Sequence, residues 1–269
     1  MRVTTAFLTA VLALTVAVTS GTASTAGKAA KVAAAGSSLV FCSDITYPPE
    51  EFYKGSTPVG SDIEIGTQVA KRMQSKAQFT NTGFDGIIPA LLAKKCDAII
   101  SGMNDTPTRR KQVAFVDYLS VGQSLMVKKG NPQHITTLAS LSGKSVSVET
   151  GTTNRDFLAA QSKKLKAAGK KSITIVTFPH DTDAANALKT GKVDAYFGDS
   201  PVVAYYIARD SSFGFGGSPI NPIPVGIALR KNDTKTVAGV RAAIKAMYAD
   251  GTMKKILAKW KMSAFALTQ

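Results

Sequence analysis

From residue 38 onward, short apolar segments with β propensity alternate with amphipathic helical segments, and this alternation restricts the chain to very few folds. A buried strand over 38–44 is followed by a helix over 60–73, in which Ser61 and Glu64 have the spacing of a capping box. The next segments are a strand at 76–82, a helix at 84–95 and a strand at 96–101. Strands and helices that alternate in this way predict a parallel sheet covered by helices.

The same alternation restarts after residue 143. The expected strands are 144–149, 172–178 and 193–199, and the expected helices are 152–169, 181–191 and 200–209, the last with Ser200 as N-cap and Pro201 behind it. A strand at 225–231 and two helices ending at Trp260 then return to the first unit. The expected fold class is α/β with two lobes, each a mainly parallel sheet flanked by helices.

Two units that the chain crosses twice imply a cleft between them. The expected first lobe comprises residues 38–126 plus 226–269, and the second comprises residues 127–225. The crossings near 123–128 and 221–226 would act as the hinge. Ligands of α/β sheets bind beyond the carboxyl ends of strands, and the candidate polar clusters fall at such ends.

Residues 1–26 follow the plan of a secretory signal peptide, with a short apolar run over 3–18 and small residues that allow cleavage after Ala23 or Ala26. An uncleaved membrane anchor is the alternative, but the apolar run is short for one. Residues 27–37 lack apolar periodicity and are expected to be a disordered leader. We therefore expect a secreted protein, periplasmic or extracellular, that stays associated with the cell envelope.

The formal net charge of +15 raises the question of a nucleic-acid partner. The lysines are scattered along helix faces in pairs such as 94–95, 163–164 and 254–255, without interleaved aromatic residues or a known binding module. A solvated basic surface is the preferred interpretation, and no nucleic-acid partner is expected. In a secreted protein such a surface fits anionic lipid headgroups or wall polymers.

The chain has two cysteines, Cys42 and Cys96, which are too few for a disulfide scaffold. They are either paired with each other or buried as thiols, and we favour buried thiols. No cysteine follows the signal region to take a lipid.

The common signatures of enzymes are missing. His134 and His180 are the only histidines and lie in separate loops, so neither a histidine-based triad nor a histidine-rich metal site is available. The segment 138–145 lacks the first glycine of a phosphate-binding loop, and 214–219 lacks the last glycine of a dinucleotide-binding motif. No catalytic residue, cofactor or metal is therefore predicted.

Several groups instead suit the binding of a small charged molecule. Arg109 lies one turn inside a helix that begins at 106–107 with an N-cap threonine and a proline, where free backbone N–H groups favour an anion. Thr152 and Thr153 open a helix after a strand, and Asp199 ends a strand. Each has an ordinary alternative. Arg109 would be a surface arginine, the two threonines would form a plain capping turn, and Asp199 would be a capping acid. Together they fit a zwitterionic ligand.

From about residue 39 to residue 262 the sequence resembles the secreted amino-acid-binding proteins of ABC uptake transporters, polar amino-acid class. The motifs that carry the resemblance are "CSDITYPPEEF", "VGSDIEIGTQVAKRM", "FDGIIPALL", "CDAIISGMNDTPTRRKQVAFVDYL", "LSGKSVSVETGTT", "VDAYFGDSPV", "GIALRK" and "DGTMKKILAKW". The resemblance implies two α/β lobes that close on a ligand like a trap. It also implies a membrane permease as the partner.

The resemblance further implies a role for each binding group. Arg109 would clasp the α-carboxylate of the ligand with help from Thr152 and Thr153, whereas Asp199 would take the α-amino group. The residues implied around the ligand side chain are Asp44, Tyr47, Glu50 and Phe84. The remaining predicted ligand-binding residues are Ser101, Gly102, Asn104 and Glu149.

The chain departs from the family pattern at three positions. Asn104 stands where a hydroxyl residue is usual, Ser61 where an aromatic residue is common, and Glu50 where a phenylalanine is expected. Asp44, Glu50 and Glu149 would then all lie near the ligand side chain, where they repel one another unless a cation is present. A cationic amino acid is favoured, with a neutral polar one such as glutamine as the next choice.

The predicted function is therefore delivery of a free cationic or polar amino acid to the permease of an ABC transporter by a monomeric binding protein that performs no chemistry. The alternative is a secreted dehydratase of arogenate or prephenate type on the same fold, with Glu149 or Glu50 as a general acid. A third interpretation, a basic wall-associated structural protein, predicts no small-molecule ligand.

Overall fold

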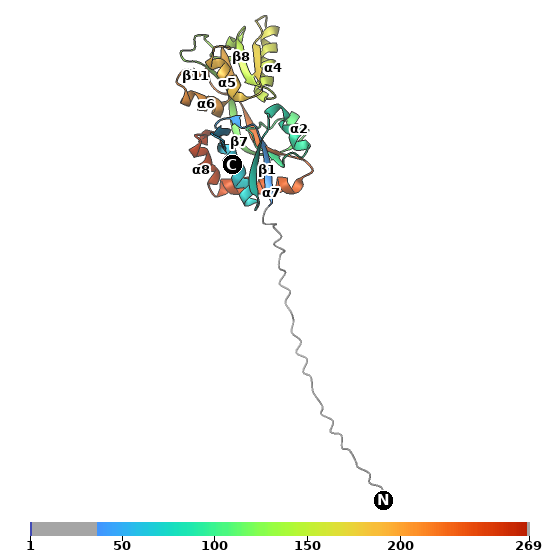
Figure 1. Ribbon diagram of the computed structural model, residues 1–269. Helices are drawn as coiled ribbons and strands as arrows, with labels where there is room; N and C mark the ends of the chain where they lie inside the picture. The colour runs from blue at the N-terminus through green and yellow to red at the C-terminus, as the bar shows by residue number, and fades with distance from the viewer. Residues whose placement is uncertain (2–36, 268–269) are drawn as a thin grey trace. The chain divides into compact units, whose positions relative to one another are not determined.

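The computed structural model describes Met1 and residues 37–267. The expected signal peptide and leader, apart from Met1 and Ser37, lie outside the described residues. Within the described part of the chain, no helix has both the length and the hydropathy that crossing a membrane requires. The account below concerns residues 37–267, drawn as a coloured ribbon in Figure 1.

A mixed nine-stranded sheet has the strand order β5-β1-β6-β12-β7-β10-β8-β9, with β11 paired to β7 alone. Its strands are β1 (Ser38–Ser43), β5 (Lys76–Asn81), β6 (Ala98–Ile99), β7 (Ala114–Lys128), β8 (Ser145–Glu149), β9 (Thr174–Phe178), β10 (Ala195–Asp199), β11 (Phe213–Phe215) and β12 (Ile220–Leu229). The pairs within β5-β1-β6 and within β10-β8-β9 are parallel, whereas every pair made by β7 or β12 is antiparallel. The fold is α/β, as expected, with two parallel sets of strands that we call the β1 half and the β8 half.

The long strands β7 and β12 connect the two halves (Figure 1). One end of β7 pairs with β12 beside β6, and its other end pairs with β10, as at Asp199 and Gln123. The sheets expected as separate are therefore joined into one. The sequence pattern did not predict β7 because its buried residues do not alternate regularly with exposed ones.

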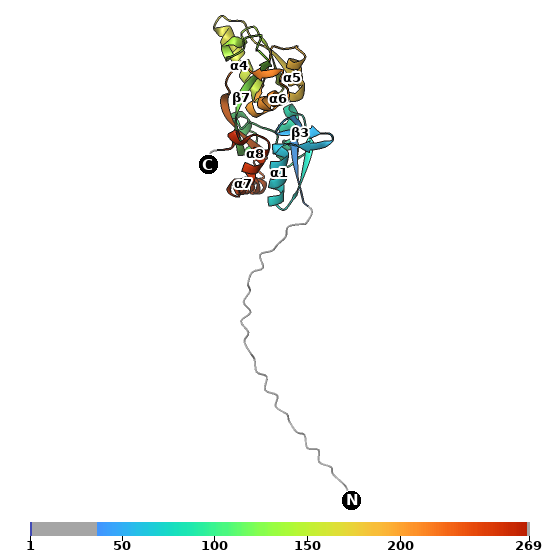
Figure 2. The same cartoon turned by 90° about the vertical axis from the view of Figure 1, so that its left-hand side faces the viewer.

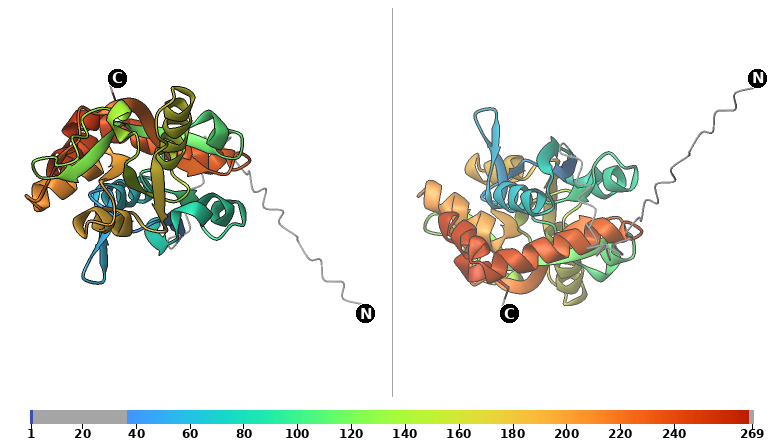
Figure 3. Two further views of the ribbon diagram at one scale, coloured as in Figure 1. Left: turned by 90° about the horizontal axis from the view of Figure 1, so that it is seen from above. Right: turned by 90° about the horizontal axis from the view of Figure 1, so that it is seen from below.

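Helices cover both halves of the sheet. The α-helices are α1 (Ser61–Arg72), α2 (Ile87–Leu92), α3 (Pro107–Arg110), α4 (Thr153–Ala167), α5 (Asp181–Lys189), α6 (Ser200–Arg209), α7 (Thr234–Ala249) and α8 (Thr252–Lys259). The 3₁₀ helices are η1 (Phe84–Gly86), η2 (Leu138–Leu141) and η3 (Ser263–Phe265). In Figure 2, α1, α7 and α8 lie together, and the view from below in Figure 3 shows the length of α7.

Each half contains its own apolar core. In the β1 half, Phe41, Leu119 and Met247 are fully buried in one cluster. In the β8 half, Leu158 and Phe197 belong to another cluster, which includes no residue of the first. Burial of each such side chain contributes about 1.5–3 kcal/mol, so each half has its own source of stability.

A second, three-stranded antiparallel sheet was not predicted. It consists of β2 (Thr46–Tyr47), β3 (Glu51–Lys54) and β4 (Thr57–Val59). The hairpin of β3 and β4, drawn in light blue, projects from the body in Figure 3. The register pairs Tyr47 with Glu51, and both side chains are buried.

Two expected helix caps are wrong by one residue. Gly60, not Ser61, is the N-cap of α1, with a φ of 137° and no side-chain cap. A Cβ atom at Gly60 would lie 2.0 Å from the carbonyl oxygen of Glu50, so only glycine fits this turn. Asp199, not Ser200, is the N-cap of α6. The cap at Thr106 is confirmed, because its hydroxyl accepts a hydrogen bond from the backbone N–H of Arg109.

The two cysteines form a disulfide, so our preference for buried thiols was wrong. Cys42 lies on β1, and Cys96 lies just before β6, the parallel neighbour of β1. The Cα atoms, 54 residues apart in sequence, are 5.7 Å apart in space. The pair links two adjacent strands of the β1 half, a relationship that only the strand order reveals.

Candidate functional site

A very small cavity of about 10 Å³ lies beyond the carboxyl ends of β1, β6, β8 and β10. This is the edge at which α/β sheets bind ligands. The cavity is lined by Asp44, Tyr47, Glu51, Phe84, Ser101, Gly102, Asn104, Glu149, Thr152, Asn154 and Asp199. These residues come from both halves of the sheet, so the cavity lies between the halves.

The cavity brings together most of the residues predicted from the sequence. Of the twelve predicted ligand-binding residues, only Glu50, Arg109 and Thr153 are not among those that line it. Glu51 and Asn154 line it without having been predicted. Arg109 and Thr153 nevertheless touch its wall, whereas Glu50 lies behind it.

Arg109 is buried at the edge of the cavity, on the short helix α3. Its Nη1 donates a hydrogen bond to the backbone oxygen of Asn104 (2.8 Å), and its Nη2 donates to that of Gly151 (3.2 Å). The guanidinium carbon lies 5.3 Å from the ring centre of Phe84. Burial lowers the pKa of Arg109, but an arginine remains charged at neutral pH.

Asn104 connects the two halves across the cavity. Its side-chain oxygen accepts a hydrogen bond from the hydroxyl of Thr153 (2.5 Å), at the start of α4. Its Nδ2 donates a long hydrogen bond of 3.4 Å to Oδ2 of Asp199. The Thr152 hydroxyl meanwhile caps α4 by accepting from the N–H of Arg155.

Asp199 is held by amide groups rather than by a cation. Nδ2 of Asn154 donates to its Oδ1 at 3.0 Å, and its backbone N–H donates to the hydroxyl of Tyr47 at 3.3 Å. Burial raises the pKa of Asp199 to about 6, although the bonds from Asn154 and Asn104 act in the opposite direction. A positively charged ligand group would favour the ionised form of this carboxyl group.

A second group of acids lies next to Ser101 and Gly102, and of these only Glu51 lines the cavity. The hydroxyl of Ser101 donates to Oε1 of Glu51 (2.8 Å), and the N–H of Gly102 donates to Oδ2 of Asp62 (2.9 Å). The pKa values of Glu50 and Glu51 are both raised well above the usual range. Burial is the largest cause, and repulsion from Asp62 is the second. Among the described residues, Oε2 of Glu50 and of Glu51 has no hydrogen-bond partner.

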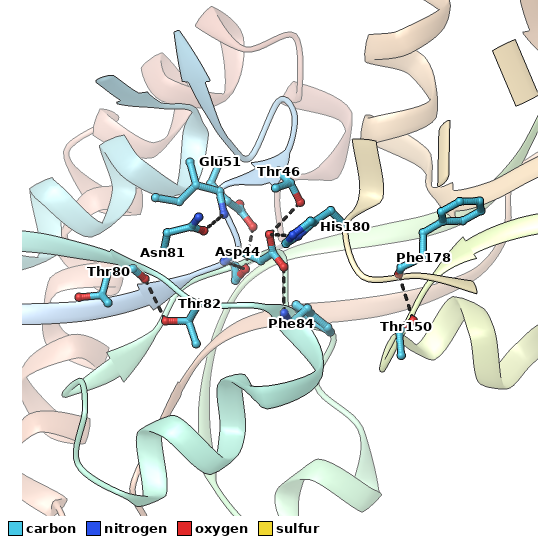
Figure 4. Close-up of polar contacts among 12 residues, drawn as sticks. Asp44, Thr46, Glu51, Thr80, Asn81, Thr82, Phe84, Thr150, Phe178 and His180 are labelled. Atoms are coloured by element: carbon cyan, nitrogen blue, oxygen red, sulfur yellow. Dashed lines mark hydrogen bonds and ion pairs between the residues drawn. The ribbon is translucent and has the colours of Figure 1, made fainter. Parts of the chain in front are cut away.

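The carboxylate of Asp44 is fixed at one end of the cavity (Figure 4). Its Oδ1 accepts from the hydroxyl of Thr46 (2.8 Å), and its Oδ2 accepts from the N–H of Phe84 (2.9 Å). Nδ1 of His180 lies 3.6 Å from Oδ1. Burial raises the pKa of Asp44, whereas Thr46, Phe84 and His180 lower it.

Acidic groups greatly outnumber buried cations at this site. Arg109 is the only lysine or arginine buried within residues 37–267. The buried carboxyl groups at or behind the cavity are Asp44, Glu50, Glu51, Asp62, Glu149, Asp181 and Asp199. Burial, with repulsion from Asp181, raises the pKa of Glu149 well above its usual range, and burial raises that of Asp181 to about 7. The site therefore retains protons that a bound cation would displace.

The described residues contain no group of three or more histidine, cysteine, aspartate or glutamate side chains placed to hold a metal ion. The acids are arranged around hydroxyl and amide donors, as the bonds of Asp44 and Asp199 show. Such an arrangement suits an organic cation that donates hydrogen bonds.

Comparisons with known proteins identify proteins that are similar to this chain in sequence and structure. ABC transporter arginine-binding protein 1 of Escherichia coli strain K12 is 32% identical over 234 residues, which cover 85% of this chain and 92% of that protein. A solved structure of an ancestral arginine-binding protein bound to arginine is 35% identical, with a TM-score of 0.77 over 83% of this chain and 97% of that one. The ancestral amino acid-binding protein AncCDT-1, a precursor of cyclohexadienyl dehydratase, is 33% identical with a TM-score of 0.75, over 83% and 95% of the two chains.

The family model of the bacterial extracellular solute-binding proteins, family 3, matches residues 39–263. This range includes both halves of the sheet, the strands that connect them and every residue of the cavity wall. The expected resemblance is thereby confirmed, and the chain belongs to the bacterial extracellular solute-binding proteins, family 3.

Proposed function

We propose that the protein binds one free amino acid with a cationic side chain outside the cytoplasm and delivers it to the permease of an ABC transporter. The observation that carries this proposal is the excess of buried carboxyl groups at a cavity where Arg109 is the one buried cation among residues 37–267. Arg109 and Asp199 suffice for the two charges of an α-amino acid. The remaining acids favour a further positive charge on the ligand side chain. Relatives named as arginine-binding proteins support the same ligand class.

In this proposal Arg109 binds the α-carboxylate. A guanidinium has five N–H donors, and the bonds to Asn104 and Gly151 use two of them. The remaining donors suit a bidentate carboxylate, which Thr153 would assist with its hydroxyl. The α-ammonium group would bind Asp199, in place of the long contact that Asn104 makes with it.

The ligand side chain would extend between Tyr47 and Phe84 toward the acids at the other end of the cavity. Aromatic rings of this kind pack against an aliphatic stem and attract a cation. Asp44 and Glu149 line that end. Oε1 of Glu149 is buried and has no hydrogen-bond partner among residues 37–267, so it offers an acceptor for a guanidinium or ammonium group.

The two halves of the fold support a proposed binding motion. We propose residues 38–126 plus 226–269 as one lobe and residues 127–225 as the other, with the hinge at 123–128 and 221–226. The contacts of Asn104 with Thr153 and Asp199 join the two lobes and would form on closure. A ligand stabilises the closed form by its additional contacts with both lobes, and the permease would receive that form from a monomer.

A competition experiment tests the proposed ligand class. In isothermal titration, arginine and lysine should outcompete glutamine and glutamate by at least about tenfold, or about 1.4 kcal/mol. Glu149→Gln and Glu50→Gln should reduce this margin, whereas Glu64→Gln, a change at an acid paired with Lys259 on the surface, should leave it unchanged. A wild-type preference for glutamate would contradict the proposal.

An enzymatic function on the same fold has one observation in its favour. The pKa of Glu149 is raised well above its usual range by burial, followed by repulsion from Asp181, so its carboxyl group can hold a proton as a general acid does. AncCDT-1, described as a precursor of a dehydratase, shares the fold. Chromatography after incubation with arogenate and prephenate separates the two functions, because a binding protein returns its ligand unchanged.

A further inference from the structure

His180 contacts Asp44, a residue of the cavity wall, from the opposite half of the sheet. It is the N-cap residue of α5, in the short connection that follows β9. The backbone N–H and the hydroxyl of Thr150 both donate to the carbonyl oxygen of Phe178, at 2.8 and 3.0 Å. These bonds attach the connection to the turn after β8 and so hold His180 next to Asp44 (Figure 4).

The two nitrogen atoms of a histidine differ in what they face, and here only one is buried. Nδ1 of His180 is inaccessible to solvent and has no hydrogen-bond partner among the described residues. It lies 3.6 Å from Oδ1 of Asp44, while the side chain as a whole is 44% exposed. The imidazole therefore directs one nitrogen at a buried carboxylate, while the rest of the side chain is partly exposed to solvent.

Asp44 cannot turn away from this histidine without losing other bonds. Thr46 and the N–H of Phe84 each hold one of its oxygen atoms. Its backbone N–H also donates to the hydroxyl of Ser101 (2.9 Å). A positive charge on His180 would consequently act on a carboxylate that is already fixed.

We propose that His180 determines ligand specificity. In its protonated form His180 neutralises the charge of Asp44 and so disfavours a cationic ligand side chain. In its neutral form it leaves Asp44 to the ligand. This inference rests on the proposed function, because it assigns the side-chain end of the ligand to Asp44. The protein would then discriminate arginine from glutamine more strongly at neutral than at acidic pH, since glutamine has no charge for His180 to repel.

Other titratable groups act on Asp44 or contact His180, and their effects must be separated from that of the histidine. Glu51 on β3, Glu149 on β8 and Asp181 on α5 interact electrostatically with Asp44, and the backbone N–H of Asp183 donates to the carbonyl oxygen of His180. Protonation of these carboxyl groups at low pH also weakens the binding of a cation. The contribution of the histidine is therefore the difference between the wild-type protein and a variant that lacks the imidazole.

His180→Asn is a suitable variant, because asparagine is a favourable N-cap and carries no charge. His134→Asn is the matched control: His134 is exposed, has a φ of 54° that asparagine tolerates, and lies in another loop. The affinities for arginine and glutamine should be measured by isothermal titration at pH 5.5 and pH 8.0. On acidification the arginine-to-glutamine ratio should fall at least about threefold more in the wild type and in His134→Asn than in His180→Asn.

The reciprocal effect gives a second measurement on the wild-type protein. With two histidines in the chain, the two variants assign the imidazole resonances in an NMR titration. Saturating arginine should shift the titration midpoint of His180 to lower pH, whereas glutamine should shift it less, because a coupling between two binding events is mutual. The midpoint of His134 should not move.

The outcomes distinguish this inference from the proposed function. If arginine does not bind at either pH, the proposed function fails. If arginine binds, but the ratio changes with pH as much in His180→Asn as in the wild type and the midpoint does not respond to arginine, the role of His180 is overturned while the proposed function stands.

Discussion

Nε2 of Gln123 donates a hydrogen bond of 2.6 Å to Oδ1 of Asn154, and this bond joins the connecting strand β7 to the wall of the cavity. Asn154 in turn donates to Asp199. The side-chain oxygen of Gln123, Oε1, accepts a hydrogen bond of 3.1 Å from Nδ2 of Asn221, on β12. A chain of three amides therefore runs from both connecting strands to Asp199, the residue proposed to bind the α-ammonium group. Each hydrogen bond determines which way the next amide faces.

This chain predicts that Gln123→Leu weakens ligand binding without touching the ligand. The substitution leaves the amides of Asn154 and Asn221 without their buried partner, which should lower the free energy of unfolding by about 1–3 kcal/mol. Ligand affinity should also fall, because Asn154 no longer has a defined orientation toward Asp199. Urea denaturation and isothermal titration measure the two effects. Gln133→Leu, at an exposed glutamine bonded to Lys144, should change neither by more than about 0.5 kcal/mol.

Arg109→Lys should reduce the affinity for the amino acid by a factor of about 30 to 1000, or about 2–4 kcal/mol. A lysine retains the charge but cannot bind a carboxylate with two parallel hydrogen bonds while also bonding Asn104 and Gly151. Isothermal titration with arginine provides the measurement. Arg72→Lys, on α1 and paired with the exposed Asp250, is the control. Binding by Arg109→Lys within threefold of the wild type would show that the carboxylate has another partner.

The buried acids predict that the ligand-free protein becomes more stable as the pH falls from about 7 to about 5. Burial raises the pKa of Asp62 and Asp199 to about 6 and that of Asp181 to about 7. The same groups have pKa values of about 3.9 in the unfolded chain, so between about pH 4 and 7 the folded state binds more protons. Its stability therefore decreases as these groups ionise.

Below about pH 4 the trend should reverse. Bonds from Ser212 and Thr252 lower the pKa of Asp210 and Asp250 to about 2, so the stability that these two carboxylates provide is lost as they become protonated. A maximum of Tm near pH 5 is the expected result of a thermal-shift series without ligand. Asp62→Asn should flatten the slope between pH 5 and 7. A wild-type Tm that rises steadily from pH 5 to 8 would mean that the acids are not buried as the structure has them.

The sequence predicted those parts of the site that have a local signal. Arg109 was found from its threonine and proline cap, and Asp199 from its place between a strand and a helix. Glu51 was missed in favour of Glu50, because the choice between adjacent side chains depends on the small sheet in which Glu51 pairs with Tyr47. The sequence shows no strand pattern from which that sheet could be predicted.

Other features depend on segments that meet only in the folded chain. The disulfide requires β1 and β6 to be neighbours, and the separation of the two cysteines in sequence contains no such information. From the sequence, His180 was considered only for a catalytic triad or a metal site, and neither was found. Its position against Asp44 arises from the meeting of the two halves of the sheet, 136 residues apart. Helices and strand ends were thus predictable, whereas contacts across the cavity were not.

The single tryptophan of the chain should report closure of the proposed lobes. Trp260 follows α8, and its ring packs edge-on against Phe52 at 5.8 Å, while its Nε1 donates to Glu64 at 3.1 Å. Phe52 also contacts the ring of Tyr205 on α6, at 5.5 Å. Tyr205 belongs to the proposed lobe 127–225 and the other two rings to the proposed lobe 38–126 plus 226–269, so this aromatic contact crosses between the proposed lobes.

A change in lobe orientation would move Tyr205 relative to Phe52 and alter the exposure of the indole to solvent. Addition of arginine should therefore change the emission of Trp260 in a saturable way, with the same Kd as isothermal titration gives. Trp260→Phe should abolish the signal and keep the affinity, because Trp260 does not line the cavity. Arg109→Lys should require a correspondingly higher arginine concentration for the same change. Unchanged emission at concentrations that saturate the calorimetric signal would indicate that the lobes do not move when the ligand binds.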